Sequence, residues 1–170
     1  MAKLIKTDEI VNFSETSFIL DTNVWLYAYS DYNTNDFGYS SVLELLLENN
    51  ANILLPPIVS TEFINRYCRQ AFEVFKQAQK RYSYKKDFRP TIHYQTAFSY
   101  ITGVLREDIH PITSFVGIDE KDLKDAVCKP CLGDLNDDII LNIALRTDSI
   151  IITHDRDYLQ TNKKVKIIQL

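Results

Sequence analysis

The sequence predicts an α/β fold, a three-layer α/β/α sandwich with a mainly parallel central sheet. Short apolar runs that suit buried strands alternate along the chain with longer segments whose apolar residues have helical spacing. Of the 170 residues, 45% are hydrophobic and 25% are charged, which is typical of one globular domain with a sizeable core. Because no linker, repeat or low-complexity tract divides the sequence, we expect a single domain over residues 1–170.

Five short segments are predicted to be strands because each is an apolar run of suitable length. Pro56 and Pro57 end the second of them, and the fourth is the clearest because it contains three consecutive isoleucines. In chain order, the predicted strands are residues 17–20 (SFIL), 52–55 (NILL), 112–116 (ITSFV), 149–153 (SIIIT) and 165–170 (VKIIQL).

The segments between these strands are predicted to be helices. Several leucines give residues 37–48 an apolar face, and the Asn49-Asn50 pair ends that helix. Four aromatic residues recur at near-helical spacing in a long helix over residues 60–81, and a first turn rich in acids favours a short helix over residues 119–127. The other predicted helices are the apolar stretch from Val24, residues 92–106 and residues 132–148, and residues 82–90 (YSYKKDFRP) are predicted to be a loop or break.

Charge and composition exclude several classes of protein. The net charge of −4 and the pI near 5.4 argue against a strongly basic nucleic-acid binder, but not against an enzyme that acts on nucleic acid. The four glycines form neither a Walker-type loop nor a GxGxxG motif. No apolar run approaches the roughly 20 residues that span a bilayer, and the charged start lacks a signal-peptide stretch. We therefore expect a cytoplasmic protein without a membrane anchor.

Carboxylates follow the predicted strands at points that share one edge of a parallel sheet. Asp21 comes directly after the strand at residues 17–20, and Asp155 follows the strand at residues 149–153 by one residue. Glu62 lies early in the helix that follows the second strand, which also places it near this edge.

A further acidic group, Asp134, Asp137 and Asp138, opens the helix over residues 132–148. Residues three and four apart share a helix face, so we expect these three carboxylates to project together. Clustered carboxylates repel and raise one another's pKa, and a hard divalent cation removes that conflict. Oxygen ligands without a nearby histidine or cysteine favour Mg²⁺ or Mn²⁺ over Zn²⁺. Such a site suits hydrolysis of a phosphodiester with one metal ion or two.

Each carboxylate also has a purely structural explanation. Asp21 and Asp134 suit the N-cap position of a helix, Glu62 suits a first helical turn, and Asp155 suits a turn. Four regions that deliver carboxylates to one rim are harder to explain in this way than any single one of them.

Four sequence blocks resemble those of PIN-domain ribonucleases, including members of the VapC-toxin type, and occur in the family's order. The first is FILDTNVWL, the second is PPIVSTEFINR, and the run LNDDIILNIALRTDSIIITHDRDY contains the third and fourth. The resemblance implies a catalytic, metal-binding acidic quartet of Asp21, Glu62, Asp137 and Asp155. It also implies that Asp138 is the close alternative to Asp137 as a ligand, and that Asn23 and Thr153 orient ligands or water.

The resemblance implies an activity and partners as well. PIN-domain ribonucleases have a compact α/β/α fold, depend on a divalent metal and hydrolyse RNA, here by analogy to products with a 5′-phosphate. Many small bacterial members are toxins that a partner protein neutralises, so an antitoxin and a second copy of the chain are candidate partners. The segment around residues 80–117 is longer and more aromatic than in the smallest toxin-like members, and we interpret it as a helical and basic insertion.

Basic and aromatic residues alternate between residues 76 and 89. Basic side chains hold phosphates and aromatic rings stack on unpaired bases, so this stretch is predicted to guide RNA beside the acidic site, with a solvated loop as the alternative. Arg66 and Arg69 lie one to two turns beyond Glu62 and are candidates to hold a phosphate near the metal. The predicted RNA-binding residues are Arg66, Arg69, Lys80, Arg81, Lys85, Lys86 and Arg89.

Two other functions compete with a ribonuclease. ILDTNVWL also resembles the haloacid-dehalogenase superfamily, where the aspartate after the first strand is phosphorylated, and GDLNDD matches its metal motif through Asp134 and Asp138. Asn23 stands where those phosphatases usually have a second aspartate, which argues against that assignment. The other alternative is a non-catalytic PIN-like module that binds RNA or protein, and an acid turned away from the other three would favour it.

Cys128 and Cys131 form a CxxC motif between two predicted helices. A thioredoxin-like CxxC follows an early strand and starts a long helix, which this pair does not. We interpret the two residues as reduced thiols in a loop, with a stress-dependent disulfide as the alternative.

Overall fold

A parallel sheet forms the centre of the computed structural model, which describes residues 2–7, 16–77 and 81–170. Over these residues the sheet has six strands in the order β1-β6-β5-β2-β3-β4, and every pairing between them is parallel. The strands are β1 (Lys3–Ile5), β2 (Ser17–Leu20), β3 (Asn52–Leu55), β4 (Ser114–Phe115), β5 (Ile150–Ile152) and β6 (Lys166–Ile168). The predicted fold class is confirmed.

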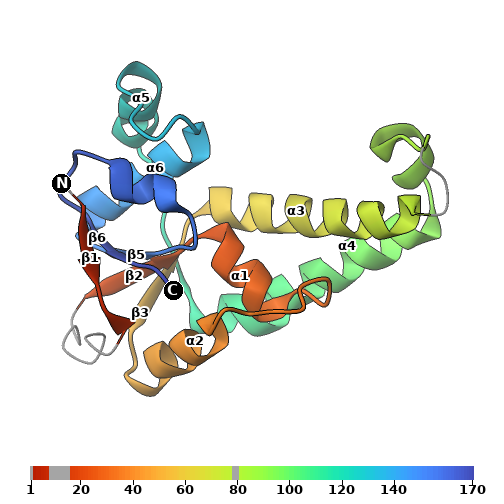
Figure 1. Ribbon diagram of the computed structural model, residues 1–170, viewed down its shortest axis with the longest axis horizontal. Coiled ribbons are helices and arrows are strands. Elements are labelled where there is room, and N and C mark those ends of the chain that lie inside the picture. Colours follow the sequence, from red (N-terminus) through yellow and green to blue (C-terminus); the bar gives the residue numbers. More distant parts are fainter. Residues whose placement is uncertain (1, 8–15, 78–80) are drawn as a thin grey trace.

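Helices cover both faces of the sheet, as strands buried on both sides require. α5 and α6 lie on one face, and α1 and α2 lie on the other together with the α3–α4 pair (Figure 1). Within the described ranges, no helix is both long and apolar enough to cross a bilayer. The main helices are α1 (Thr22–Tyr29), α2 (Tyr39–Glu48), α3 (Pro57–Lys76), α4 (Ile92–Val104), α5 (Glu120–Cys128) and α6 (Leu135–Thr147). Shorter helical turns are η2 (Tyr84–Phe88), η3 (Leu105–Ile109), η4 (His110–Ile112) and η5 (Arg156–Gln160).

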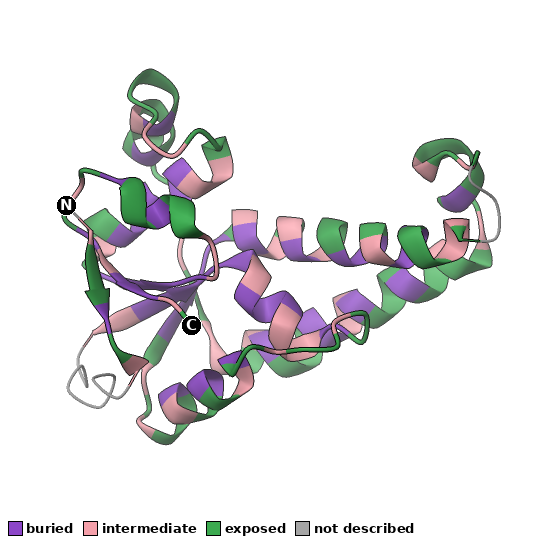
Figure 2. Cartoon of the chain, in the orientation of Figure 1, coloured by how far each residue is buried: buried purple, intermediate pink, exposed green. Residues whose placement is uncertain are grey.

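The strand β2 lies inside the sheet, between β3 and β5. Phe18 pairs with Ile53 of β3 on one side and with Ile150 of β5 on the other. Phe18, Ile19 and Leu20 are each at most 1% exposed, and the inner strands are buried after their first residue, with β5 buried throughout (Figure 2). Because the apolar run ends at the carboxyl edge of the sheet, the next residue of the chain emerges directly at that edge.

The helices α3 and α4 pack against each other and form an arm that extends away from the sheet (Figure 1). α3 begins at the sheet with Pro57 at its start, where the missing N–H costs no helical hydrogen bond. Near the far end of the arm, the rings of Phe72 and Phe75 contact the buried ring of Phe88, with centroids 5.5 and 5.1 Å apart. The far end of the arm therefore has a small aromatic core of its own.

Several boundaries differ from those expected from the sequence. β1 was not predicted, because it is a short edge strand in which Lys3 and Leu4 are exposed and only Ile5 is buried. The segment over residues 82–90 is not a simple loop but contains the helical turn η2, which closes on the aromatic core of the arm. The long helix begins at Pro57 and its described part ends at Lys76, while residues 78–80, including Lys80, lie outside the described residues.

Arg146 of α6 connects α6 to α5. Its guanidinium donates hydrogen bonds to Asp122 Oδ2 from Nε at 3.0 Å and from Nη2 at 2.8 Å. Asp122 is 3% exposed, and its carboxylate also accepts a hydrogen bond from the Asp119 N–H at 3.0 Å, which caps α5. These contacts hold α5 against the helix that carries the acidic first turn.

We expect Asp122→Ala to lower the free energy of unfolding by about 2–4 kcal/mol, because it leaves a partly buried guanidinium without its main partner and removes a helix cap. Asp125→Ala on the same helix is the control, since Asp125 makes only a 3.9 Å contact with the exposed Lys129 and should change stability by about 0.5 kcal/mol or less. Denaturant unfolding followed by circular dichroism measures both. Equal losses in the two variants would contradict this account of α5.

Candidate active site

Asp21 occupies the junction between β2 and α1 and is only 5% exposed. Its backbone is extended, so it caps α1, and its Oδ1 accepts a hydrogen bond from the Thr22 N–H at 2.6 Å. Its Oδ2 accepts hydrogen bonds from Asn23 Nδ2 at 2.8 Å and from Thr153 Oγ1 at 2.7 Å. The capping explanation and the site explanation therefore both apply to the same carboxylate.

Asn23 and Thr153 link the carboxyl ends of β2 and β5. Asn23 Oδ1 accepts a hydrogen bond from the backbone N–H of His154 at 3.2 Å. Thr153 Oγ1, besides donating to Asp21, accepts from the backbone N–H of Asp155 at 2.9 Å. These two side chains fix the Asp21 carboxylate relative to the chain that carries Asp155, which is the placement expected for supporting residues.

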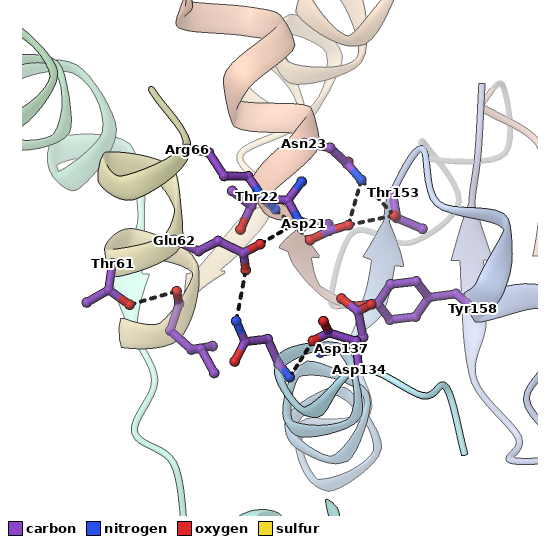
Figure 3. Close-up of polar contacts among 12 residues, drawn as sticks. Asp21, Thr22, Asn23, Thr61, Glu62, Arg66, Asp134, Asp137, Thr153 and Tyr158 are labelled. Atoms are coloured by element: carbon purple, nitrogen blue, oxygen red, sulfur yellow. Dashed lines mark hydrogen bonds and ion pairs between the residues drawn. The ribbon is translucent and has the colours of Figure 1, made fainter. Parts of the chain in front are cut away.

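Asp137 lies in the first turn of α6, and its side chain projects toward Asp21 (Figure 3). The hydroxyl of the buried Tyr158 donates a hydrogen bond to Asp137 Oδ1 at 3.1 Å. Asp134 is the N-cap of α6, and its Oδ1 accepts from the Asn136 N–H at 2.8 Å. The sequence therefore forms α6 by ordinary capping chemistry and sets Asp137 on its inner face.

The carboxylates lie close enough to change one another's pKa. Burial raises the pKa of Asp21 to about 6, against the lowering effect of its hydrogen bonds from Thr153 and Thr22, and the charge of Glu62 raises it further. Burial also raises the pKa of Asp137 to about 7, with additional repulsion from Asp21. Two carboxyl groups with raised pKa values therefore face each other at the carboxyl edge of the sheet.

Glu62 projects from α3 toward the same place. Its Oε1 lies 2.6 Å from Nη2 of Arg66, one turn further along the helix, and its Oε2 accepts a hydrogen bond from Asn136 Nδ2 at 3.4 Å. The Glu62 side chain is 16% exposed, whereas that of Arg66 is 54% exposed. Arg66, expected to hold a phosphate, thus forms an ion pair with one of the predicted acids.

Asp138 does not join this group, and the expectation that three aspartates of α6 project together is wrong for it. Asp138 is fully buried, and its carboxylate accepts hydrogen bonds from the Cys131 backbone N–H at 3.1 Å and from the Cys131 thiol at 2.9 Å. Asp134 is a cap with an extended backbone, so the helical spacing rule does not apply to it. One residue of helix, about 100° of rotation, separates the directions of Asp137 and Asp138.

Most of the predicted RNA-binding residues lie far from the carboxylates. Arg81, Lys85 and Lys86 are exposed, and the segment with η2 lies at the far end of the arm (Figure 1). α3 rises about 21 Å between Glu62 and Lys76 at 1.5 Å per residue. The expectation that this stretch lies beside the acidic site is therefore wrong, because α3 is a continuous helix that carries it outward. Two of the arginines lie over aromatic rings of the arm, Arg69 over Tyr84 at 5.1 Å and Arg89 over Tyr94 at 5.5 Å.

Asn136 and Tyr158 of the site were not singled out from the sequence, whereas Thr22 was expected to make the turn after Asp21 and support the site. Asn136 reaches Glu62, and Tyr158 donates to Asp137. The hydroxyl of Thr22 is buried beside Asp21 and has no hydrogen-bond partner among the described residues. The signals were weak but present, since Asn136 precedes Asp137 directly and Tyr158 ends the fourth block.

Comparison with known proteins identifies the family. The family model described as PIN domain matches residues 18–164. The chain belongs to the PIN domain family. This match replaces the haloacid-dehalogenase alternative, which also required Asp138 as a metal ligand, whereas Asp138 is buried against Cys131.

Solved structures share the fold of this PIN domain at low sequence identity. VapBC2 from Rickettsia felis, bound to a DNA fragment from its promoter, has a TM-score of 0.55 and 13% identity, with 91% of this chain and 100% of that chain covered. FitAcB from Neisseria gonorrhoeae has a TM-score of 0.56 and 14% identity, with 89% of this chain and 96% of that chain covered. A search of curated proteins finds no match.

The donor chemistry of this PIN domain fits a hard divalent cation. In the part of the chain that the structure describes, no three Asp, Glu, His or Cys side chains are grouped closely enough to hold a metal ion as they stand. However, Asp21 and Asp137 repel each other, and the buried Thr22 hydroxyl has no partner among the described residues. Oxygen donors with raised pKa values are what Mg²⁺ or Mn²⁺ would stabilise in the charged form. Asp21, Asp137, Glu62 and Asp155 are the residues that would hold it.

Because its pKa is raised, Asp137 by itself contributes less to the stability of the metal-free protein at neutral pH than in acid. A carboxyl group whose pKa is raised from 3.8 to about 7 on folding contributes stability below pH 3.8 that is lost as the pH rises through 7. We expect Asp137→Asn in EDTA to raise the free energy of unfolding at pH 8 by about 1–3 kcal/mol, discounted for partial exposure, and to have little effect near pH 4.

Thermal unfolding across this pH range measures the effect, with Asp125→Asn as a matched carboxylate on the outer helix α5. An Asp137→Asn variant that is less stable than wild type at pH 8 would contradict the proposed repulsion.

Proposed function

We propose that this PIN domain is a divalent-metal-dependent endoribonuclease that hydrolyses RNA phosphodiester bonds. The observation that carries the proposal is the pair of facing carboxyl groups, Asp21 and Asp137, whose pKa values are raised to about 6 and about 7. Strongly perturbed carboxyl groups in one place are typical of catalytic sites. The family supports the same conclusion, because PIN domains as a family are nucleases.

In this proposal the acidic quartet is formed by Asp21, Glu62, Asp137 and Asp155. Thr153 and Asn23 hold the Asp21 carboxylate in one orientation through hydrogen bonds of 2.7 and 2.8 Å. Tyr158 does the same for Asp137. One bound Mg²⁺ or Mn²⁺, or two, would activate a water molecule and neutralise charge on the phosphate.

Arg66 has two roles in this proposal. In the metal-free protein its Nη2 lies 2.6 Å from Oε1 of Glu62, and this ion pair neutralises the Glu62 carboxylate. Arg66 also lines a groove of about 330 Å³ together with Asn23, Tyr27, Asn33, Arg69 and Gln70, among others. Because this groove adjoins the supporting residue Asn23, Arg66 and Arg69 are suited to hold phosphates of an RNA strand that leads to the carboxylates.

Glu62 argues against the alternative of a non-catalytic RNA-binding or protein-binding module. That alternative would be favoured by an acid turned away from the others. The Glu62 carboxylate contacts Asn136 on α6, and its charge contributes to the raised pKa of Asp21. It therefore belongs electrostatically to the same group.

We extend the proposal to the cellular setting. The resemblance to VapC-type PIN ribonucleases supports a toxin that an antitoxin protein neutralises, and the similar solved structures include VapBC2 and FitAcB. We also propose a homodimer in the cytoplasm and one domain over residues 1–170, in which the segment around residues 80–117 is an insertion that contributes to the arm.

Purified wild-type protein is expected to cleave a random-sequence RNA pool with Mn²⁺ or Mg²⁺ and to leave 5′-phosphate ends. EDTA should abolish cleavage, and Asp21→Asn should lower the rate by about 100-fold or more, because it replaces a charged ligand by a neutral isostere. Asp125→Asn on α5 is the control and should cleave at the wild-type rate. Gel electrophoresis of end-labelled RNA measures the rates, and cleavage that persists in EDTA or in Asp21→Asn would refute the mechanism.

Arg66→Gln tests the ion pair with Glu62. Because the guanidinium competes with a cation for the same carboxylate, we expect Mn²⁺ to bind the variant about 2- to 5-fold more tightly, in line with the small free energy of an exposed pair. Arg69→Gln is the matched control one turn further along α3, where the guanidinium lies over Tyr84 instead.

Isothermal titration calorimetry with Mn²⁺ gives both affinities without reference to activity. Unchanged or weaker Mn²⁺ binding in Arg66→Gln would contradict the proposed competition between Arg66 and a cation for Glu62.

A further inference from the structure

An aromatic platform, here Tyr27, Phe37 and His154, lies beside the acidic group. The ring of Phe37 has its centroid 4.9 Å from that of Tyr27, edge-on, and 4.7 Å from the imidazole of His154. Tyr27 and His154 are also in edge contact at 5.3 Å. The α1 helix and the turn before α2 thus meet a residue that follows β5, more than 110 residues further along the chain.

The platform adjoins the carboxylates through His154. His154 lies between Thr153 and Asp155 in sequence, and its backbone N–H donates to Asn23 Oδ1 at 3.2 Å. The hydroxyl of the fully buried Tyr39 lies 3.2 Å from His154 Nδ1 and donates to the Thr153 carbonyl at 2.9 Å. Tyr39 is therefore the structural support that fixes the His154 ring one residue from a proposed metal ligand.

Phe37 as a residue is 43% exposed although its neighbours are aromatic. Its backbone has φ of +54°, and the next residue, Gly38, has φ of +83°. A bulky residue at positive φ is strained, and such strain is typical of functional positions. Asn35 and Asp36 hold this turn, since their Oδ1 atoms accept from the N–H groups of Phe37 and Gly38 at 2.8 and 3.0 Å. The turn therefore keeps an apolar ring at the surface instead of burying it.

Tyr27 connects the platform to a groove whose charged lining residues are Arg66, Arg69 and Glu73. It lines the groove of about 330 Å³ that also includes Arg66 and Arg69, and it contacts the Phe37 ring. An RNA strand whose phosphates lie in the groove would thus pass the carboxylates, with the aromatic platform beside it. A single nucleotide has a phosphate, which arginines bind, and a flat base, which stacks on an aromatic ring. The groove and the platform together provide both kinds of partner.

We propose that the exposed face of Phe37 stacks on an unpaired nucleobase of the RNA strand whose phosphate lies at the carboxylates. The inference rests on the proposed ribonuclease function and adds a base-binding position to it. Tyr27 and His154 set the orientation of the Phe37 ring, and the base covers the surface that the protein leaves exposed. A base within a duplex cannot present its face in this way, so this position selects unpaired RNA.

Fluorescence anisotropy with a short, labelled, random-sequence oligoribonucleotide tests the proposal. The Asp21→Asn background prevents cleavage during binding. In that background we expect Phe37→Ala and Phe37→Leu to weaken binding by about 10-fold, the usual effect of one lost stacking contact, while Phe37→Trp keeps the affinity. Leucine retains apolar bulk, so its loss of affinity separates stacking from simple packing.

Phe98→Ala is the matched control, because Phe98 is 42% exposed but lies on α4 in contact with Tyr94. It should leave binding unchanged. A labelled RNA duplex of the same length should bind all Phe37 variants equally.

The outcomes separate this inference from the proposed function. Wild-type protein that cleaves RNA with Mn²⁺ while Phe37→Leu binds as tightly as the parent would overturn the base position and leave the nuclease intact. A chain that neither cleaves nor binds RNA would overturn both. Loss of binding in Phe37→Ala that Phe37→Trp restores, with Phe98→Ala unaffected, supports the base position.

Discussion

The burial of the Asp21 carboxylate, at the carboxyl end of the inner strand β2, constrains every other part of the site. β2 is covered on both sides by other strands and on both faces by helices, so the residue that follows it emerges into a nearly closed space, where Asp21 is 5% exposed. A charge in such a place is costly unless it is bonded and compensated. Thr22, Asn23 and Thr153 donate hydrogen bonds to the Asp21 carboxylate, but none of them carries a positive charge. A bound cation would supply that charge.

This constraint explains how the remaining side chains are arranged. Asp137 adds to the negative charge instead of relieving it, while Arg66 neutralises Glu62 from the groove side. The apolar strands therefore supply the stability that keeps the mutually repelling carboxylates in place. Such an opposition between stability and site chemistry is common at active sites. The aromatic platform and the groove that contains Arg66 and Arg69 meet at Asn23. An RNA strand could therefore contact the arginines, the platform and the carboxylates from one side.

Periodicity and strand length predicted the centre of the fold well, because residues 17–20 and 52–55 are each apolar after their first residue and their bounds match β2 and β3. β1 was missed because an exposed edge strand has no such pattern. The placement of Asp21, Glu62, Asp137 and Asp155 at one edge follows from parallel topology, which sequence can indicate. The direction of Asp138 depends on where α6 begins, which the spacing of the three aspartates alone does not show. The ion pair between Glu62 and Arg66 joins residues four apart on α3, so the sequence does contain its pattern.

The most direct test of the central claim is the position of Mn²⁺ in crystals of the protein, located from its anomalous scattering. We expect a peak about 2 Å from carboxylate oxygens of both Asp21 and Asp137, with Glu62 turned from Arg66 toward the ion. A peak elsewhere, or none at a Mn²⁺ concentration at which RNA is cleaved, would contradict the claim that these carboxylates form a metal centre.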